Sequence, residues 1–398
     1  MLKWLEKCGV KMQDFDYLAA NDVYLDSACQ SLRPRPVIDA LNRYYTEHNS
    51  CGERVKYAWG RKTDELVEGT RDQLLKFLKL KNRDYFVSFT LNTTYGINLL
   101  LQQIKPELFE KVMTSDIEHN SPFLATMTFA KKAGIPREVM VREHDGSIDL
   151  SKYDFKKALV VVNCASNIDG RKLSNLKDLV KNVHKQGGVI IIDAAQAMAH
   201  SSDILEKTEA DAICGSAHKI YGPSLGFMIV RRDLLPKIET SFIGGGMVDD
   251  VDKEKYQLSA ESPNHTYTKF ESGLQAWGEI IAFGEALKWL EKRSKADKKN
   301  LADCSQRLFD FLKSQPRVHL VNEEANPTIS FYVDGLDSHL LGQALSGEGI
   351  MARTGYFCVH YYLDHVMNYP PLIRFSMGYH IRPSDIDKTI KTLERVLG

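Results

Sequence analysis

Short apolar runs alternate with amphipathic stretches in the middle of the chain. The runs KALVVVN (157–163) and GGVIIIDA (187–194) are rich in β-branched residues and bounded by turn residues, which predicts two buried strands. Between them, SNLKDLVKNVHKQ (174–186) carries Leu and Val at helical spacing, begins at a Ser and ends before a pair of glycines. The pattern therefore predicts a strand–helix–strand unit with a right-handed crossover.

The same alternation continues on both sides of this unit. The segments ADAICGS (210–216) and GFMIVRR (226–232) are predicted to be further strands, and TTYGINLLLQQI (93–104) is predicted to be a helix that begins on threonines. Strands that alternate with helices are typical of an α/β fold. We therefore predict a large domain over residues 20–285 with a mainly parallel central sheet.

The last third of the chain has a different pattern. A charged stretch around 285–297 is predicted to be one long helix that leads into a smaller domain. Beyond it we expect an alternating strand, a helix that runs into a turn, and an amphipathic helix, at 327–333, 340–350 and 384–397. Ser384 or Asp385 is the expected cap of the last helix. We predict a small α+β domain made of residues 1–19 and 286–398.

Composition and charge narrow the class of protein. The 398 residues suffice for one large core and a smaller domain, and 43% hydrophobic with 26% charged residues is ordinary for a globular enzyme. Lys plus Arg equals Asp plus Glu, so charge gives no reason to expect nucleic acid or a membrane surface as partner. The chain shows no apolar run of membrane-spanning length and no signal peptide, which predicts a cytoplasmic protein.

The cysteine pattern favours free thiols over a metal site or a disulfide framework. Seven cysteines with no paired spacing predict a reducing compartment, and no Cys-x-x-Cys or His-x-x-x-His pair indicates zinc. Cys164 and Cys214 lie in or beside apolar strands, so we expect them in the core. Cys29 and Cys51 remain candidates for a place near an active site.

Side chains with useful chemistry follow two of the predicted strands. Asp193 ends one strand, and the next runs into Ser216, His218 and Lys219. The carboxyl ends of strands in such a sheet face one crevice. A lysine there can form a Schiff base and an aspartate can hold a positive charge, the pair that pyridoxal phosphate requires. Either residue alone would equally fit a salt-bridged aspartate or a solvated lysine at a loop end.

Seven segments resemble, in order, the motifs of one enzyme family. They are YLDSACQSLRP (24–34), FTLNTTYGINLL (89–100), DIEHNS (116–121), NCASNIDGRKL (163–173), DAAQ (193–196), GSAHKIYGPSLGF (215–227) and FESG (270–273). The first is similar to an LDNAA pattern of that family. Together they resemble the class V, fold-type I pyridoxal-phosphate enzymes, closest to the group II cysteine desulfurases and selenocysteine lyases.

The resemblance implies a role for each matched residue in binding pyridoxal 5'-phosphate. Lys219 would form the Schiff base and later move the Cα proton, and Asp193 would pair with the ring nitrogen. Gln196 would bind the phenolic oxygen, and His119 would stack on the ring and act as an acid–base group, although a helix cap is the usual role of such a histidine. The phosphate would be held by Thr93, Thr94, Ser216 and His218.

Further matches imply how the substrate is held. Asn167 would contact the cofactor oxygen or the substrate carboxylate, and Arg374 in PLIRFSMGYH would clamp that carboxylate with its two-pronged guanidinium. A salt bridge at the surface is the alternative for Arg374. The segment RTGYFC (353–358) resembles the RTGxHC loop, whose cysteine attacks the sulfur of bound cysteine. Cys358 would thus be the nucleophile, with Arg353 favouring its thiolate.

The resemblance therefore implies a homodimeric cysteine desulfurase that yields alanine and a Cys358 persulfide for a sulfur acceptor. Two departures leave alternatives open. Phe357, after Tyr356, stands where the family usually has histidine, and Leu274 replaces a threonine that reaches the partner subunit's phosphate. The alternatives are a C–S lyase, an epimerase or an aminotransferase that does not use Cys358, and a non-catalytic scaffold.

Overall fold

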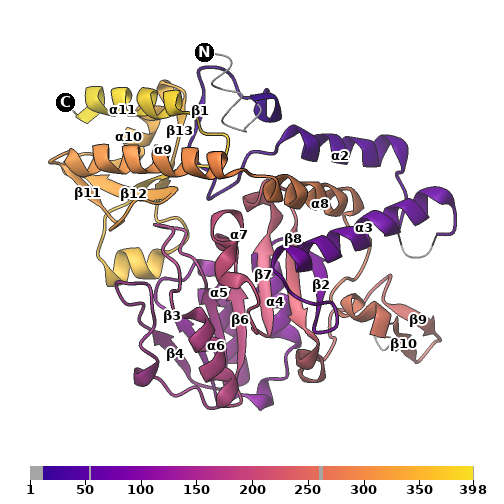
Figure 1. Cartoon of the computed structure of the whole chain (residues 1–398). Coiled ribbons are helices and arrows are strands. Elements are labelled where there is room, and N and C mark those ends of the chain that lie inside the picture. Colours follow the sequence, from indigo (N-terminus) through magenta and orange to yellow (C-terminus); the bar gives the residue numbers. More distant parts are fainter. Residues whose placement is uncertain (1–11, 53–54, 260–262, 398) are drawn as a thin grey trace.

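A seven-stranded sheet forms the centre of the structure, a computed structural model that describes residues 12–52, 55–259 and 263–397 (Figure 1). Its strands are β2 (Tyr85–Thr90), β3 (Lys111–Ser115), β4 (Arg137–Met140), β5 (Ala158–Asn163), β6 (Val189–Asp193), β7 (Ala212–Ser216) and β8 (Gly226–Arg231). They lie in the order β2-β8-β7-β6-β5-β3-β4. Among them, β8 runs antiparallel to both of its neighbours and the other pairings are parallel. The predicted α/β class and mainly parallel sheet are confirmed.

Alternate residues of the central strands supply two separate cores, one on each face of the sheet. Leu159 and Val161 of β5 join one core with α4 (Thr93–Gln103) and α5 (Asn120–Ala133). Val160 and Val162 join the other core. That second face is covered by α3 (Ala58–Phe77), α6 (Leu176–Lys185) and α8 (Trp277–Glu291). Burial on both faces explains why β5 is an uninterrupted run of β-branched and aliphatic residues.

A second, four-stranded antiparallel sheet lies at the end of the chain. Its strands, in the order β11-β12-β15-β14, are β11 (Val318–Leu320), β12 (Thr328–Val333), β15 (Leu372–Ser376) and β14 (Arg353–Gly355). The helices of this part are α9 (Lys295–Ser314), α10 (Ser338–Gly347) and α11 (Pro383–Leu397). The strand β1 (Val23–Tyr24) pairs in parallel with β13 (Ile350–Met351), so the start of the predicted large domain contacts the small one. The domain boundaries stay predictions.

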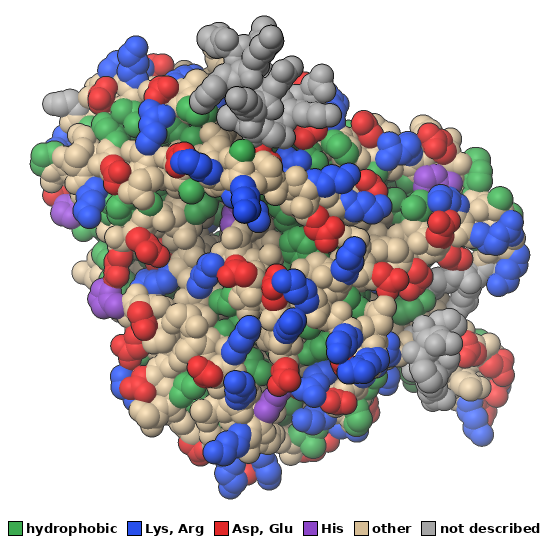
Figure 2. Space-filling model, viewed as in Figure 1, with side chains coloured by type: hydrophobic (Ala, Val, Ile, Leu, Met, Phe, Trp, Pro, Cys, Tyr) green, Lys and Arg blue, Asp and Glu red, His purple; other side chains and the backbone are tan. Residues whose placement is uncertain are grey.

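Further elements of the described ranges are α2 (Arg35–Glu47), the short α7 (Ala197–His200) and a hairpin of β9 (Val248–Val251) with β10 (Tyr256–Leu258). None of the helices in the described ranges is long and apolar enough to cross a membrane. Acidic and basic side chains are interspersed over the face shown in Figure 2, as the balanced composition suggests.

Two predictions about helices are wrong. The charged stretch around 285–297 is divided between α8 and α9, because Ser294 and Asp297 form a capping box that begins a new helix. The final helix begins at Pro383, so Ser384 and Asp385 lie in its first turn and neither precedes it. The Asp385 carboxylate accepts a hydrogen bond from the backbone N–H of Arg382 (2.9 Å) and satisfies a free donor at the helix start.

Candidate active site

Every residue that the sequence predicts for the site lines one cavity of about 300 Å³. These residues are Thr93, Thr94, His119, Asn167, Asp193, Gln196, Ser216, His218, Lys219, Arg353, Cys358 and Arg374. The wall includes the last residues of β5, β6 and β7, at the carboxyl edge of the large sheet, where ligands bind in α/β folds. The strand β14 and the loop after it close the cavity from the small sheet, so the site draws on both parts of the chain.

Hydroxyl and amide groups gather at the start of α4. The Thr93 backbone N–H donates to Ser216 Oγ (3.0 Å), and the hydroxyls of the two residues lie 2.6 Å apart. Thr94 Oγ1 lies 2.6 Å from Ser121 Oγ. Asn92 caps the helix by accepting from the N–H of Tyr95 (2.9 Å). A helix N-terminus surrounded by hydroxyl donors fits a phosphoryl group.

Asp193 is buried and Lys219 is partly exposed in the cavity, and desolvation shifts their two pKa values in opposite directions. Burial raises the pKa of Asp193, while the Ala195 N–H (2.9 Å) and the Lys219 charge lower it. Burial lowers the pKa of Lys219, with Asp193 opposing and Arg374 adding to the shift. Lys219 therefore loses its proton more readily than an ordinary lysine, which a Schiff base or a proton transfer needs.

Two histidines of the cavity are held in the neutral form. Burial, followed by the charges of Lys219 and Arg374, lowers the pKa of His119 to about 4. Burial, followed by Lys219, also lowers the pKa of His218 to about 4. His119 lines the cavity and also caps α5. Its Nδ1 accepts a hydrogen bond from the N–H of Ser121 (3.1 Å) at the start of that helix. With Nδ1 as acceptor, the proton is assigned to Nε2, so His119 can donate from that atom.

Arg374 is buried in the wall and forms no salt bridge at the surface. Its NH2 group pairs with Asp26 Oδ1 (3.0 Å), and NH1 donates to the backbone carbonyl of Asn167 (3.0 Å). Nε has no hydrogen-bond partner among the described residues, although the side chain is almost inaccessible. The Phe357 ring covers one side of the guanidinium. Arg374 thus places a positive charge in the cavity wall while its Nε–H stays buried and unsatisfied.

The loop that carries Cys358 has an uncommon backbone. Phe357 (φ 48°) and Cys358 (φ 60°) both adopt left-handed conformations, which non-glycine residues rarely do. Two hydrogen bonds hold them: the Asn120 N–H donates to the Cys358 carbonyl (2.6 Å) and Asn167 Nδ2 donates to the Phe357 carbonyl (2.9 Å). Cys358 is exposed, whereas Phe357 is buried. The strain places an aromatic ring inward and the thiol at the cavity.

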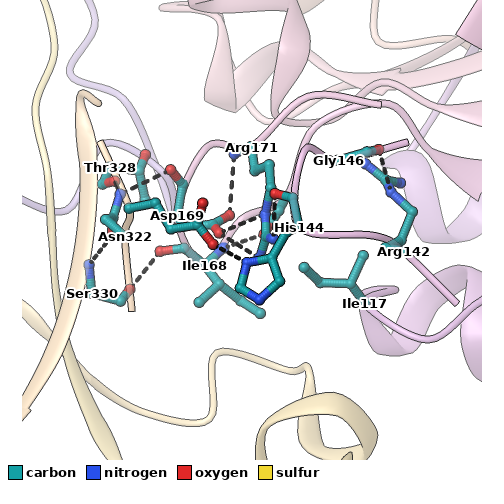
Figure 3. Close-up of polar contacts among 12 residues, drawn as sticks. Ile117, Arg142, His144, Gly146, Ile168, Asp169, Arg171, Asn322, Thr328 and Ser330 are labelled. Atoms are coloured by element: carbon teal, nitrogen blue, oxygen red, sulfur yellow. Dashed lines mark hydrogen bonds and ion pairs between the residues drawn. The ribbon is translucent and has the colours of Figure 1, made fainter. Parts of the chain in front are cut away.

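The loop that carries Asn167 is itself fixed to the small sheet (Figure 3). Asn322 Nδ2 donates to the carbonyl of Asp169 (3.0 Å). On β12, the Ser330 hydroxyl donates to the carbonyl of Ile168. Because Asn167 bonds the Phe357 carbonyl, its side chain connects the large-domain loop to the thiol-bearing loop. One of its two amide hydrogens is thereby committed.

Several wall residues were not predicted from the sequence. They are Ala28, Asn92, Ser121, Asn163, Ala165, Ala195 and Phe357. Ser121 lies within the DIEHNS motif, so a search for hydroxyls beside His119 would have found it. Of the two candidate cysteines, Cys29 lines the cavity and Cys51 does not. Cys164 and Cys214 are buried in the core, as predicted, and burial raises the pKa of each thiol.

Comparison with known proteins supports one family. The model of the aminotransferase class-V family matches residues 23–389. A probable cysteine desulfurase of Haemophilus influenzae is 28% identical over 408 residues, which cover 100% of this chain and 91% of that protein. An apo cysteine desulfurase of Thermococcus onnurineus superposes with a TM-score of 0.85 at 24% identity, over 94% of each chain.

A second solved structure is the cystine C–S lyase C-DES in complex with its reaction product, cysteine persulfide. It superposes with a TM-score of 0.78 at 19% identity, over 94% of this chain and 97% of that chain. At these identities the two structures show a common fold. The family match extends over most of the sequence and includes both sheets and the whole cavity. The chain belongs to the aminotransferase class-V family.

Proposed function

We propose that the protein is a pyridoxal-phosphate-dependent cysteine desulfurase, which converts L-cysteine to L-alanine and leaves the sulfur on Cys358. The observation that carries the proposal is the common cavity of Cys358 and Lys219. A base for the Cα proton and a nucleophile for the substrate sulfur are both needed in this reaction. The desulfurase of Haemophilus influenzae, similar over the full chain, supports the same assignment.

The residues present fit pyridoxal phosphate. Thr93, Thr94 and Ser216 would hold the phosphate at the start of α4, and His218 would donate to it from its neutral ring. The buried Asp193 carboxylate suits a protonated ring nitrogen, and Gln196 and His119 also line the cavity. When bound, the cofactor supplies an aldehyde for Lys219 and an electron-withdrawing ring that stabilises charge at the substrate Cα.

Three residues would bind the substrate carboxylate. Arg374 and Arg353 place two positive charges at the cavity. Asn167 has one amide hydrogen left after bonding the Phe357 carbonyl. Asp26 occupies the NH2 group of Arg374, so a direct bond from that nitrogen to a substrate carboxylate would require the displacement of Asp26. This arrangement orients the Cβ–S bond with respect to Lys219 and Cys358.

Side chains of this protein can carry out the proton transfer and the attack on sulfur that the reaction requires. Lys219 removes the Cα proton, and the Cys358 thiolate attacks the sulfur of the substrate. A bond between the two sulfurs forms as the Cβ–S bond breaks, and its electron pair stays with the carbon skeleton of the substrate. Cβ then takes up a proton, and Lys219 returns a proton to Cα. The products are alanine and Cys358–S–SH, so cysteine carbon is reduced and its sulfur is oxidised to the sulfane level. A thiol or an acceptor protein can then remove that sulfur from the exposed loop.

We further propose that the active form is a homodimer. Four apolar side chains on loops are exposed: Leu91, Phe242, Ile243 and Leu274. Leu91 lies just before α4, and the Phe242 ring lies 6.5 Å from the ring of Tyr95 in the first turn of α4. The loops that bear the last three are joined by the Gly273 N–H, which donates to the Gly245 carbonyl (2.7 Å). Exposed apolar groups gathered in this way favour burial against another subunit. Leu274 cannot donate to a phosphate, so its contribution would be apolar contact alone.

One assay tests the proposed function. The holoenzyme and its Cys358→Ala and Cys51→Ala variants are incubated with L-cysteine, and alanine, pyruvate and sulfide are quantified. We expect alanine in stoichiometric relation to sulfane sulfur, loss of both in Cys358→Ala, and no change in Cys51→Ala. Pyruvate and ammonia formed equally by Cys358→Ala would identify a C–S lyase. No product from L-cysteine in any form would overturn the proposed desulfurase.

A further inference from the structure

Cys29 lies in the cavity wall, and hydrogen bonds hold the chain segments before and after it in place. Its own N–H donates to the carbonyl of Asp26 (3.1 Å), which closes a turn. The preceding Ala28 donates its N–H to Ser376 Oγ (2.9 Å) and accepts from Gln196 Nε2 (2.7 Å). The turn that carries Cys29 is thus tied to β15 and to the segment after β6. Cys29 therefore occupies a defined place in the cavity.

The other end of this segment is tied to the lysine. Both the N–H and the hydroxyl of Ser31 donate to the carbonyl of His218 (2.9 Å each), one residue before Lys219. Lys219 and Arg374 line the cavity together with Cys29 and Cys358. Two thiols therefore border the same cationic groups in one cavity.

Cationic groups in the cavity wall suit anionic sulfur. Lys219, Arg353 and Arg374 all line the cavity. Adjacent cations stabilise the anionic form of a thiol or a persulfide. Cys51 is exposed outside the cavity, and Cys164 and Cys214 are closed off in the core. In the described chain, only Cys29 shares these surroundings with Cys358.

We propose that Cys29 is a second sulfur carrier of the active site, which accepts the sulfane sulfur from Cys358. The inference rests on the proposed desulfurase function. The Cys29 thiolate attacks the outer sulfur of Cys358–S–SH. A new S–S bond forms at Cys29, the S–S bond at Cys358 breaks, and the electron pair leaves with the Cys358 sulfur, which departs as a thiolate and can take up a proton. No oxidant or reductant is consumed.

The transfer would allow each chain to turn over two molecules of cysteine before a sulfur acceptor is needed. Cys358 becomes a free thiol again while the first sulfur stays in the cavity. A second molecule of cysteine can then react before any acceptor arrives. Each chain would hold sulfur on two residues, Cys29 and Cys358, and the exposed Cys358 would exchange it with the outside.

Counting alanine without a sulfur acceptor tests this proposal. Holoenzyme, freed of reductant, is mixed with excess ³⁴S-labelled L-cysteine, the alanine burst is measured, and blocked peptides are mapped by mass spectrometry. We expect a burst of about two equivalents per chain in the wild type, with label on both cysteines. Cys29→Ser should give about one equivalent with label on Cys358 alone, and Cys51→Ala should behave as the wild type.

The outcomes separate this inference from the proposed function. A wild-type burst of about one equivalent, with label on Cys358 and none on Cys29, would overturn the inference and leave the desulfurase standing. No alanine from any form would overturn both. Label on Cys29 in a Cys358→Ala variant would show that Cys29 attacks the substrate directly, which also contradicts transfer from Cys358. As a check independent of turnover, mild oxidation with diamide should link Cys29 to Cys358, and failure to form this disulfide would count against their approach.

Discussion

The guanidinium carbon of Arg374 lies 4.8 Å from the centroid of the Phe357 ring. Phe357 stands directly before the proposed nucleophile, at the position where related loops usually carry histidine. Its ring is 7% exposed, so the contact between cation and ring is shielded from water. Phe357 therefore supports the residue proposed to bind the substrate carboxylate.

Removal of this ring should weaken substrate binding more than chemistry. A shielded cation–π contact contributes on the order of 1–2 kcal/mol, so Phe357→Ala should raise KM for L-cysteine by roughly 5- to 30-fold. Steady-state alanine formation measures KM and kcat separately. Phe357→Tyr keeps the ring and serves as the matched control. An unchanged KM in Phe357→Ala would mean that the ring fills space without orienting Arg374.

The residues that could be located from the sequence are those whose role depends on neighbours in the chain. Asp193 and Lys219 follow apolar strands, and the carboxyl edge of a parallel sheet collects such residues whatever the details of packing. The capping box of Ser294 and Asp297 was also visible in the sequence, but the charged pattern continues across it and hid the break between α8 and α9. Short-range signals therefore predicted the fold well and misplaced helix ends.

The contacts that could not be predicted join distant segments. Asp26 and Arg374 are 348 positions apart and meet because β1 and β15 belong to neighbouring parts of the fold. The inward turn of Phe357 depends on hydrogen bonds from Asn120 and Asn167, which lie far away in sequence. A pattern of hydrophobic residues contains no information about such partners, so the electrostatics of the cavity became visible only in the structure.

The buried ion pair between Arg71 and Glu271, beside β2, should contribute to the stability of the fold. Both oxygens of Glu271 bind Arg71, at 2.8 and 2.7 Å, and Glu271 also accepts from the N–H of Phe89 (2.6 Å). Glu271→Gln would remove the buried counter-ion of Arg71 and leave only the more exposed Glu68 carboxylate (3.0 Å), so we expect a loss of about 3 kcal/mol in free energy of unfolding. Urea denaturation measures the loss. Glu65→Gln, which removes an exposed partner of Lys62, is the control and should change little. Equal effects of the two variants would contradict the prediction.

A charge at Leu274 should separate the proposed dimer. The side chain is 78% exposed in the single chain, and a carboxylate in its place would have to be desolvated in a subunit interface. We expect Leu274→Glu to sediment as a monomer at concentrations where the wild type is dimeric. Leu340→Glu alters another exposed leucine, on α10, and should leave the dimer intact. Identical sedimentation of the wild type and Leu274→Glu would place the interface elsewhere.

The stability of the protein should fall between pH 6.5 and pH 4, in part because of His200. Burial, with a smaller effect of His380, lowers the pKa of His200 from 6.5 to about 4, and its Nδ1 has no partner. The unfolded chain takes up this proton near pH 6.5, whereas the folded chain resists until about pH 4. Lowering the pH through this window therefore favours the unfolded state, and above pH 7 the effect is absent.

The variant His200→Gln measures how much of the pH dependence of stability comes from His200. The pKa values of His119 and His218 are lowered in the same direction, so a dependence on pH will persist in His200→Gln. The variant should nevertheless lose a slope of up to about 1.4 kcal/mol per pH unit between pH 6 and pH 4.5 in urea denaturation. His144→Gln changes a histidine whose side chain is 93% exposed, and it should keep the wild-type slope. The free energies of unfolding of His200→Gln and the wild type could instead fall in parallel as the pH is lowered. His200 would then already be protonated in the folded protein at pH 5, which would contradict the prediction.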